Sequence, residues 1–214
     1  MFYAIFTRFL LPLAWWGRLQ VEGLEAVPTE GNLLLVGNHD SQFDPVLLAI
    51  GLRKRRPLRF LARADLWETF GLAPVMNGLR QIPIERGTGD TGALDKAITA
   101  LKSGEAICIF PEGKLSLGTQ LRARSGVGRL SWECRRAPVL LATIEGTTDY
   151  VRFPRRPRVR ITIFAPATGQ PRADEDPAEL AARLLAELRE RVPPTAAGRD
   201  GKGGRAARKE GARK

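Results

Sequence analysis

Short apolar runs alternate along the chain with amphipathic segments, and Gly, Pro and polar residues separate the two kinds. The apolar runs are too short for typical helices and suit buried strands. They occupy residues 32–38, 58–62, 81–85, 105–110 and 137–146. Helix-like segments follow most of these runs. This alternation predicts an α/β fold with a mostly parallel central sheet flanked by helices.

Start and stop signals mark the predicted helices. Asp44 and Pro45 supply an N-cap and a first-turn proline ahead of an apolar segment. Asp176 caps a second helix, predicted over Pro177 to Val192. A third helix lies in "TGALDKAITALKSG" and a shorter fourth in "GVGRLSWECRR". The third carries one apolar stripe, made of Leu94, Ala97, Ile98 and Leu101.

The segment "RVRITIF", residues 158–164, alternates between polar and apolar positions and predicts a half-exposed edge strand. In parallel sheets, functional sites gather at the carboxyl ends of the strands. The predicted strands here run into "GNHD", "IER" and "FPEGK". We therefore expect the site where these three segments meet.

Residues 1–18 are mostly apolar, but their pattern does not predict a helix that spans a membrane. A bilayer crossing needs about 20 mostly apolar residues, and Arg8 and Pro12 interrupt this run. It also lacks the charge order and cleavage site of a signal peptide. Trp15 and Trp16 favour a helix that lies on a membrane surface. The alternative is a helix packed on the domain's own core.

The chain thus divides into an interfacial anchor (1–18), one domain (19–192) and a tail (193–214). The formal net charge is +11. From Thr195 onward there are seven Lys/Arg and two Asp/Glu, so +5 lies in the tail. Its lack of large apolar residues predicts disorder. The positive charge favours anionic partners, namely nucleic acid, anionic lipid headgroups or phosphorylated substrates.

The two cysteines, Cys108 and Cys134, stand in apolar or helical contexts. Buried packing thiols in a reducing compartment are the expected interpretation. One histidine and two separated cysteines cannot assemble a zinc site.

The stretch "GNHDSQFDP" contains the chain's only histidine, His39, five residues before Asp44. Imidazole is suited to accept a proton near neutral pH, and a neighbouring carboxylate fixes its tautomer. In a strand-loop-helix turn, Asp44 at the helix start can face back to His39. Taken separately, Asp44 is explained by helix capping and His39 by an ordinary loop position.

Four segments taken together resemble a known family. "NHDSQFD", "QIPIER", "FPEGKLS" and "APVLLATIEGT" stand in the order and spacing of the four blocks of the lysophosphatidic acid acyltransferases, a family of glycerolipid acyltransferases. The resemblance extends from about Gly31 to Thr147. The first and third blocks together are specific, whereas the second and fourth are weak by themselves.

The resemblance implies a glycerol-3-phosphate acyltransferase-like fold and acyl transfer without a cofactor. The donor would be acyl-CoA or acyl carrier protein, and the acceptor a lysophospholipid, most simply 1-acyl-glycerol-3-phosphate. His39 would be the general base and Asp44 its orienting acid. Arg86, Glu112 and Gly113 would bind the glycerol phosphate, although Glu112 could instead hold a basic residue. The enzyme would act at the cytoplasmic face of the membrane, as a peripheral or monotopic protein.

Departures from the family pattern concern the acceptor. Lys114 and Leu115 stand where the family usually has Thr-Arg, so Lys114 would face the phosphate as a point charge. The basic residue expected after the third block is supplied by Arg122 or Arg124. A lyso-lipid other than lysophosphatidic acid, including an amino-acid-linked one, therefore remains an alternative acceptor.

Two rival classes fit the residues less well. A nucleic-acid-binding protein would explain the charge, but the chain has no aromatic-interleaved basic strand or binding motif. The basic clusters equally suit an anionic membrane surface. The second rival is a hydrolase that uses the same His-Asp pair on water. A serine hydrolase would need a GxSxG turn, which the sequence lacks.

Overall fold

The computed structural model describes residues 2–85, 91–152, 154 and 156–197. Seven strands form one sheet in the order β1-β7-β6-β2-β5-β3-β4. The strands are β1 (Gln20–Glu22), β2 (Leu33–Gly37), β3 (Arg59–Arg63), β4 (Ile82–Ile84), β5 (Ala106–Ile109), β6 (Val139–Glu145) and β7 (Arg160–Phe164). All neighbouring strands are parallel except β6 and β7. The predicted α/β class with a mostly parallel sheet is confirmed.

The prediction that residues 158–164 form an edge strand is wrong. The burial of β7 does alternate, with Ile161 and Ile163 buried. However, β7 lies between β6 and β1, and β1 is the edge strand. Gln20–Glu22 is three residues long and lacks an apolar run, so its pattern carried no strand signal.

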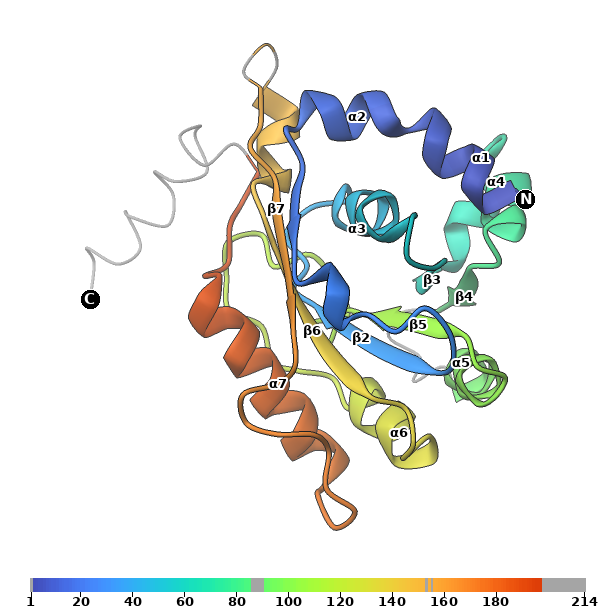
Figure 1. The fold of residues 1–214 in the computed structure, drawn as a ribbon, viewed down its shortest axis with the longest axis vertical. Coiled ribbons are helices and arrows are strands. Elements are labelled where there is room, and N and C mark those ends of the chain that lie inside the picture. The colour runs from blue at the N-terminus through green and yellow to red at the C-terminus, as the bar shows by residue number, and fades with distance from the viewer. Residues whose placement is uncertain (1, 86–90, 153, 155, 198–214) are drawn as a thin grey trace.

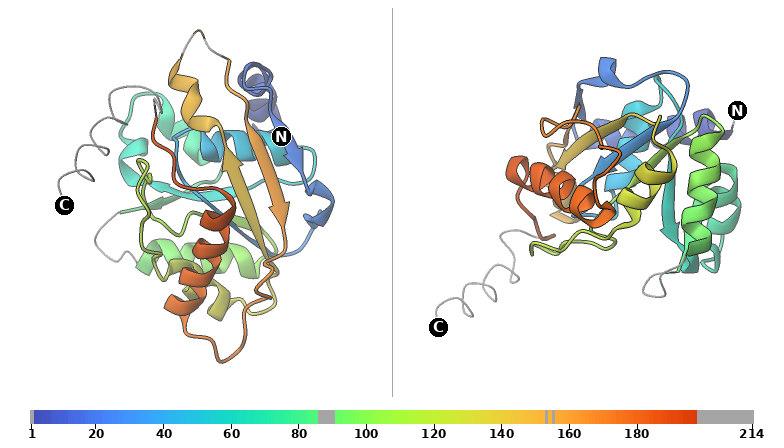
Figure 2. Two further views of the ribbon diagram at one scale, coloured as in Figure 1. Left: turned by 90° about the vertical axis from the view of Figure 1, so that its left-hand side faces the viewer. Right: turned by 90° about the horizontal axis from the view of Figure 1, so that it is seen from below.

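Helices cover both faces of the sheet (Figures 1 and 2). The described α-helices are α1 (Phe2–Phe9), α2 (Leu11–Trp16), α3 (Asp44–Leu52), α4 (Leu72–Gly78), α5 (Thr91–Lys102), α6 (Gly126–Glu133) and α7 (Pro177–Arg191). On one face α3 packs together with the N-terminal helices α1 and α2, and on the other lie α5, α6 and α7.

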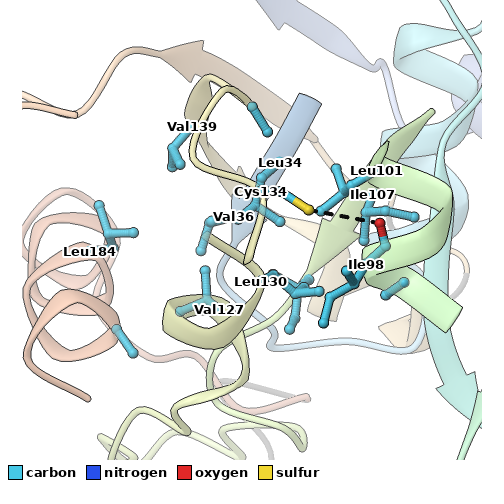
Figure 3. Close-up of a cluster of buried hydrophobic side chains, with 14 of the residues drawn as sticks. Leu34, Val36, Ile98, Leu101, Ile107, Val127, Leu130, Cys134, Val139 and Leu184 are labelled. Carbon is cyan, nitrogen blue, oxygen red and sulfur yellow. Dashed lines mark hydrogen bonds between the residues drawn. The ribbon is translucent and has the colours of Figure 1, made fainter. Parts of the chain in front are cut away.

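Strand β2 divides the hydrophobic core in two. Its side chains alternate, so Leu34 and Val36 join the cluster under α5, α6 and α7, which Figure 3 shows. Leu33 and Leu35 point to the cluster under α3 on the opposite face. All four side chains are fully buried. This two-sided burial explains why the strand reads as a continuous apolar run.

Close packing fixes α7 beside α6. Asp176 caps α7 as predicted, because its side chain accepts hydrogen bonds from the amides of Ala178 and Glu179. A Cβ atom at Gly128 of α6 would lie 1.9 Å from the carbonyl oxygen of Pro177. Glycine is therefore required at this contact, and it brings the start of α7 against α6.

The N-terminal segment forms two short helices, α1 and α2, and it both packs and exposes apolar residues. Ala14 belongs to the core cluster around α3. Ile5, Phe9 and Trp15 are 61%, 80% and 71% exposed. Within the ranges described, every helix falls short of the length and apolar character that a bilayer crossing requires. Of the predicted tail, residues 198–214 lie outside the described residues.

Candidate active site

The site lies where the three central parallel strands end. His39 follows β2, Glu112 follows β5 and Thr147 follows β6. Strand β2 pairs with both of the others, so their carboxyl ends meet at one edge. Asn38 fixes the start of the loop, because its side-chain amide exchanges hydrogen bonds of 2.9 and 2.8 Å with the backbone of Ile144.

His39 and Asp44 are in direct contact, as their spacing predicted. The imidazole Nδ1 lies 3.0 Å from Asp44 Oδ2, and both side chains are buried. The backbone amides of Asp40 and Ser41 each donate to the same carboxylate oxygen at 2.8 Å. A carboxylate held in place by these donors orients the imidazole and favours the tautomer that carries its proton on Nδ1.

Asp44 does not cap its helix, and the prediction of an N-cap there is wrong. Phe43 occupies the cap position, and no side-chain bond closes the first turn. The Asp44 carboxylate points back to the loop, and its other oxygen accepts a 2.5 Å hydrogen bond from Thr147 Oγ1. Every oxygen of this side chain thus holds the histidine loop or the end of β6.

The imidazole ring is also fixed from its face. Phe110 stacks on His39 with ring centroids 4.3 Å apart and planes 14° apart. With Nδ1 bound to Asp44, Nε2 is the nitrogen left to act, and it has no hydrogen-bond partner among the described residues. The arrangement can therefore take a proton at Nε2.

His39 lines a cavity of about 760 Å³. Its walls include the apolar side chains of Leu61, Ile84, Leu94, Ile109 and Phe110. Lys114 and Arg124 line the same cavity, and neither has an ion-pair partner in the described part of the chain. The site thus combines a polar base, apolar walls and two available positive charges.

Gly113 shapes the loop between these charges. Its φ is +67°, in the left-handed region that favours glycine. A Cβ atom there would lie 2.9 Å from Cδ and Nε of Arg124. The bare backbone lets the Arg124 side chain lie across this turn, so Gly113 positions a cavity residue and lines the cavity itself.

Comparisons with known proteins identify the family. The family profile described as Acyltransferase matches residues 18–144, more than half of the chain. The chain belongs to the acyltransferase family.

One similar protein is a probable 1-acyl-sn-glycerol-3-phosphate acyltransferase of Mycoplasma pneumoniae. The two sequences are 28% identical over an alignment that covers 62% of this chain and 51% of that protein. The chain thus spans about half the length of that relative. The 1-acyl-sn-glycerol-3-phosphate acyltransferase of Bacillus subtilis is 19% identical over 70% of this chain and 74% of its own. In fold, the chain is similar to the crystal structure of the LPA acyltransferase PlsC from Thermotoga maritima. The TM-score is 0.68 at 24% identity, covering 89% of this chain and 77% of that chain.

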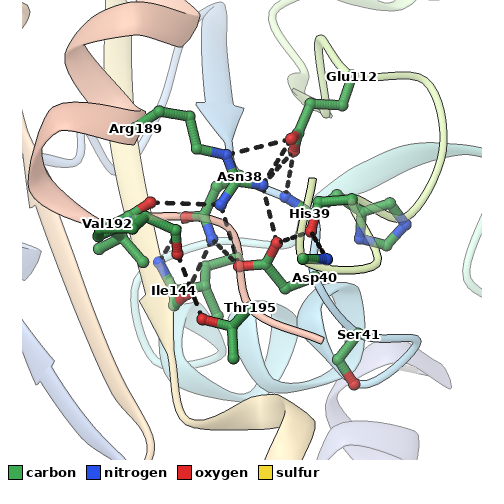
Figure 4. A network of polar contacts seen from close by, with 12 residues as sticks. Asn38, His39, Asp40, Ser41, Glu112, Ile144, Arg189, Val192 and Thr195 are labelled. Carbon is green, nitrogen blue, oxygen red and sulfur yellow. Dashed lines mark hydrogen bonds and ion pairs between the residues drawn. The ribbon is translucent and has the colours of Figure 1, made fainter. Parts of the chain in front are cut away.

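Glu112 has the second of its two expected roles, that of holding a basic residue. It is 2% exposed and is not among the residues that line the cavity. Its carboxylate accepts hydrogen bonds from the His39 amide at 2.7 Å and from Arg189 at 2.6 Å (Figure 4). Burial raises the pKa of Glu112, and the bonds from Arg189 oppose that rise. In this structure the carboxylate binds protein groups, and its predicted contact with the substrate stays a prediction.

The structure brings the predicted residues His39, Asp44, Gly113, Lys114 and Arg124 together, and their roles stay predictions. Arg86 lies outside the described residues, so its predicted place stays a prediction. Two contributors were missed, Phe110 and Arg189; Thr147 ends the fourth block, but the bond of its side chain to Asp44 was not predicted. Phe110 directly precedes the "PEGK" segment, so its position was a usable signal. No local pattern marks Arg189 or the bond between Thr147 and Asp44, because the partners lie more than 70 residues apart along the chain.

Proposed function

We propose that this chain transfers an acyl group from acyl-CoA or acyl carrier protein to the free hydroxyl of 1-acyl-glycerol-3-phosphate, giving phosphatidic acid. The observation that carries the proposal is the 3.0 Å contact between His39 Nδ1 and Asp44 beside a cavity with apolar walls and basic side chains. The two named relatives are called 1-acyl-sn-glycerol-3-phosphate acyltransferases, which supports the same reaction.

In the proposed reaction His39 is the general base. Its Nε2 takes the proton of the acceptor hydroxyl while that oxygen attacks the thioester carbonyl carbon. The tetrahedral intermediate then collapses, the carbon–sulfur bond breaks, and the leaving thiolate takes the proton from the imidazolium. Asp44 stabilises the imidazolium between the two steps. A thioester is already reactive, so alignment of the two substrates supplies much of the remaining rate.

The cavity suggests where each part of the acceptor lies. Lys114 and Arg124 suit the phosphate, since charge-assisted hydrogen bonds to phosphate are among the strongest in proteins. Arg86 is proposed as a third phosphate-binding residue because of the family resemblance alone. The apolar walls formed by Leu61, Leu94 and Ile109 suit an acyl chain.

We further propose that the protein lies on an anionic membrane surface through α1 and α2. Phe9 and Trp15 extend from these helices into solvent. The Arg156 guanidinium lies 4.6 Å from the centroid of the Trp15 ring. Apolar side chains next to a cation match the interface between acyl chains and phosphate headgroups.

A panel of lyso-lipid acceptors with one labelled acyl-CoA tests the substrate. We expect labelled phosphatidic acid from 1-acyl-glycerol-3-phosphate at a higher kcat/KM than any other product. Faster labelling of another lyso-lipid, such as an amino-acid-linked one, would move the activity to that acceptor. Labelling of none of them, by protein supplied with vesicles, would contradict acyl transfer itself.

A further inference from the structure

Arg189 joins the last turn of α7 to the histidine loop. Its side chain is 3% exposed and lies between two buried carboxylates, that of Asp40, 3% exposed, and that of Glu112, 0% exposed. The family profile ends at residue 144, so this arginine lies beyond it. We propose that Arg189 is a positioning residue for His39, holding the catalytic loop through both carboxylates. This inference rests on the proposed function.

The contacts make a bridge of charge-assisted hydrogen bonds (Figure 4). Arg189 Nη1 and Nη2 donate to the two oxygens of Asp40 at 3.0 and 2.8 Å. Nε and Nη2 donate to Glu112 at 3.1 and 2.6 Å. One planar guanidinium therefore serves two acids, which a lysine ammonium cannot reproduce with the same geometry.

Both carboxylates in turn hold the backbone that carries His39. Glu112 Oε2 accepts the His39 amide at 2.7 Å, and Asp40 is the next residue in the loop. Asp40 also accepts a short hydrogen bond from Ser116 Oγ, while the Ser116 amide donates to the His39 carbonyl at 2.9 Å. The histidine amide is thus held by Glu112, and its carbonyl by Ser116, which in turn bonds to Asp40; Arg189 contacts both carboxylates.

Removing the guanidinium leaves two buried carboxylates facing one another without a counter-charge. Their repulsion is relieved when one of them takes a proton or when the loop moves. Movement of the loop displaces His39, and a displacement of about 1 Å costs on the order of 100-fold in rate. His39 is then no longer aligned with the acceptor hydroxyl, while the cavity walls that bind the substrates stay in place.

Arg183 provides a matched control on the same helix. It is paired with buried Glu175, with Nε 2.6 Å from Oε1, and it is not among the residues that line the cavity or the loop. Arg183→Met therefore removes an ion pair from α7 and leaves the His39 loop untouched. Arg189→Lys keeps the positive charge but loses the planar guanidinium. This variant keeps the proposal testable if Arg189→Met does not fold.

The first test needs no activity. The chain has one histidine. Tag-free protein that carries isotope-labelled histidine therefore gives one backbone amide signal and one set of imidazole ring signals in NMR spectra. Arg189→Met and Arg189→Lys should each move or broaden the His39 amide signal by more than its linewidth. Arg183→Met should leave it in place. Unchanged His39 signals in folded Arg189→Lys would overturn the proposal, whether or not the wild type transfers acyl groups.

The second test is kinetic. We expect kcat to fall about 10- to 100-fold in Arg189→Met, with a smaller loss in Arg189→Lys, while the KM values of donor and acceptor stay within about twofold. Adding Asp40→Asn to Arg189→Met removes one of the two repelling charges and should restore part of kcat. Equal kcat losses in folded Arg189→Met and Arg183→Met would show that Arg189 only stabilises α7, and this result would overturn the proposal. A wild type without acyl transfer would instead count against the proposed function, and the NMR result would stand alone.

Discussion

At the scale of single residues, Asp44 carries more contacts than an orienting acid needs. One oxygen accepts His39 and two backbone amides, and the other accepts Thr147. Asp44→Asn replaces one acceptor oxygen by an NH₂ group, so either the loop or Thr147 loses its partner. We expect kcat to fall and unfolding free energy to drop by about 1–3 kcal/mol, the cost of a buried unsatisfied group.

Thr147→Val is the milder counterpart of that change. It removes the single donor to Asp44 Oδ1 and leaves the contact with His39 intact. Its kcat loss should be clearly smaller than that of Asp44→Asn, as assays of both purified variants can show. A larger effect in the valine variant would mean that Thr147 takes a direct part in the reaction.

The positive charges at the cavity give a second residue-scale prediction. Lys114→Ala and Arg124→Ala should each raise the KM of the phosphate-bearing acceptor and leave the donor KM nearly unchanged, because both side chains face the phosphate in the proposed complex. Lys114→Arg should keep or improve activity. The control is Arg122→Ala, since Arg122 is exposed and does not line the cavity. Equal KM changes in all three alanine variants would contradict a specific phosphate site.

The residues of the site differ in how far the sequence could predict them. His39 and Asp44 are five positions apart, so one turn of known type brings them together. Arg189 reaches Asp40 across 149 positions, and nothing local separates it from the other arginines of α7. Glu112 was identified as a site residue, but its partner depends on how α7 packs.

At the scale of elements, tyrosines tie the N-terminal helices to the domain. Tyr3 of α1 accepts a hydrogen bond from the Leu58 amide, and Tyr150 donates to the Leu13 carbonyl of α2 at 2.7 Å. The chain has no other tyrosine. Burial raises the pKa of both to about 12.

This gives a prediction for alkaline pH. The folded pKa is raised above the ordinary value of 10.0, so the neutral phenols add stability below about pH 10, and that stability is lost as pH rises toward about 12. Tyrosinate absorbance should therefore stay low until near pH 12 in the folded protein and rise near pH 10 in denaturant. Rising absorbance near pH 10 in both would show that the phenols are not buried.

The elements themselves were predicted well where burial is two-sided. The central strands are continuous apolar runs because both faces are covered, and that pattern is visible without a structure. Strand β1 was missed because Gln20–Glu22 gains its conformation from pairing with β7 and not from its own residues. Whether a strand lies at the edge of the sheet depends on such pairing. Because β1 was not predicted, β7 was wrongly predicted to be the edge strand.

At the scale of the whole molecule, the exposed apolar residues of α1 and α2 predict how the protein meets lipid. Phe9→Ser and Trp15→Ser should each weaken binding to anionic vesicles by about tenfold, since a large apolar side chain contributes roughly 1.5–3 kcal/mol when buried. Trp132→Ser is the control, because Trp132 is an exposed tryptophan on α6. Co-sedimentation of all three with vesicles measures the effect, and equal losses would contradict a specific membrane face.

The central claim is that the whole chain is an acyltransferase with His39 as its base, and one rate comparison tests it most directly. Transfer of a labelled acyl group to 1-acyl-glycerol-3-phosphate is measured for wild type and His39→Ala, with thermal unfolding of both as a check on folding. We predict a fall in kcat of roughly 10²–10⁴, the contribution of a general base. A folded His39→Ala variant that transfers acyl groups at a near-normal rate would contradict the account.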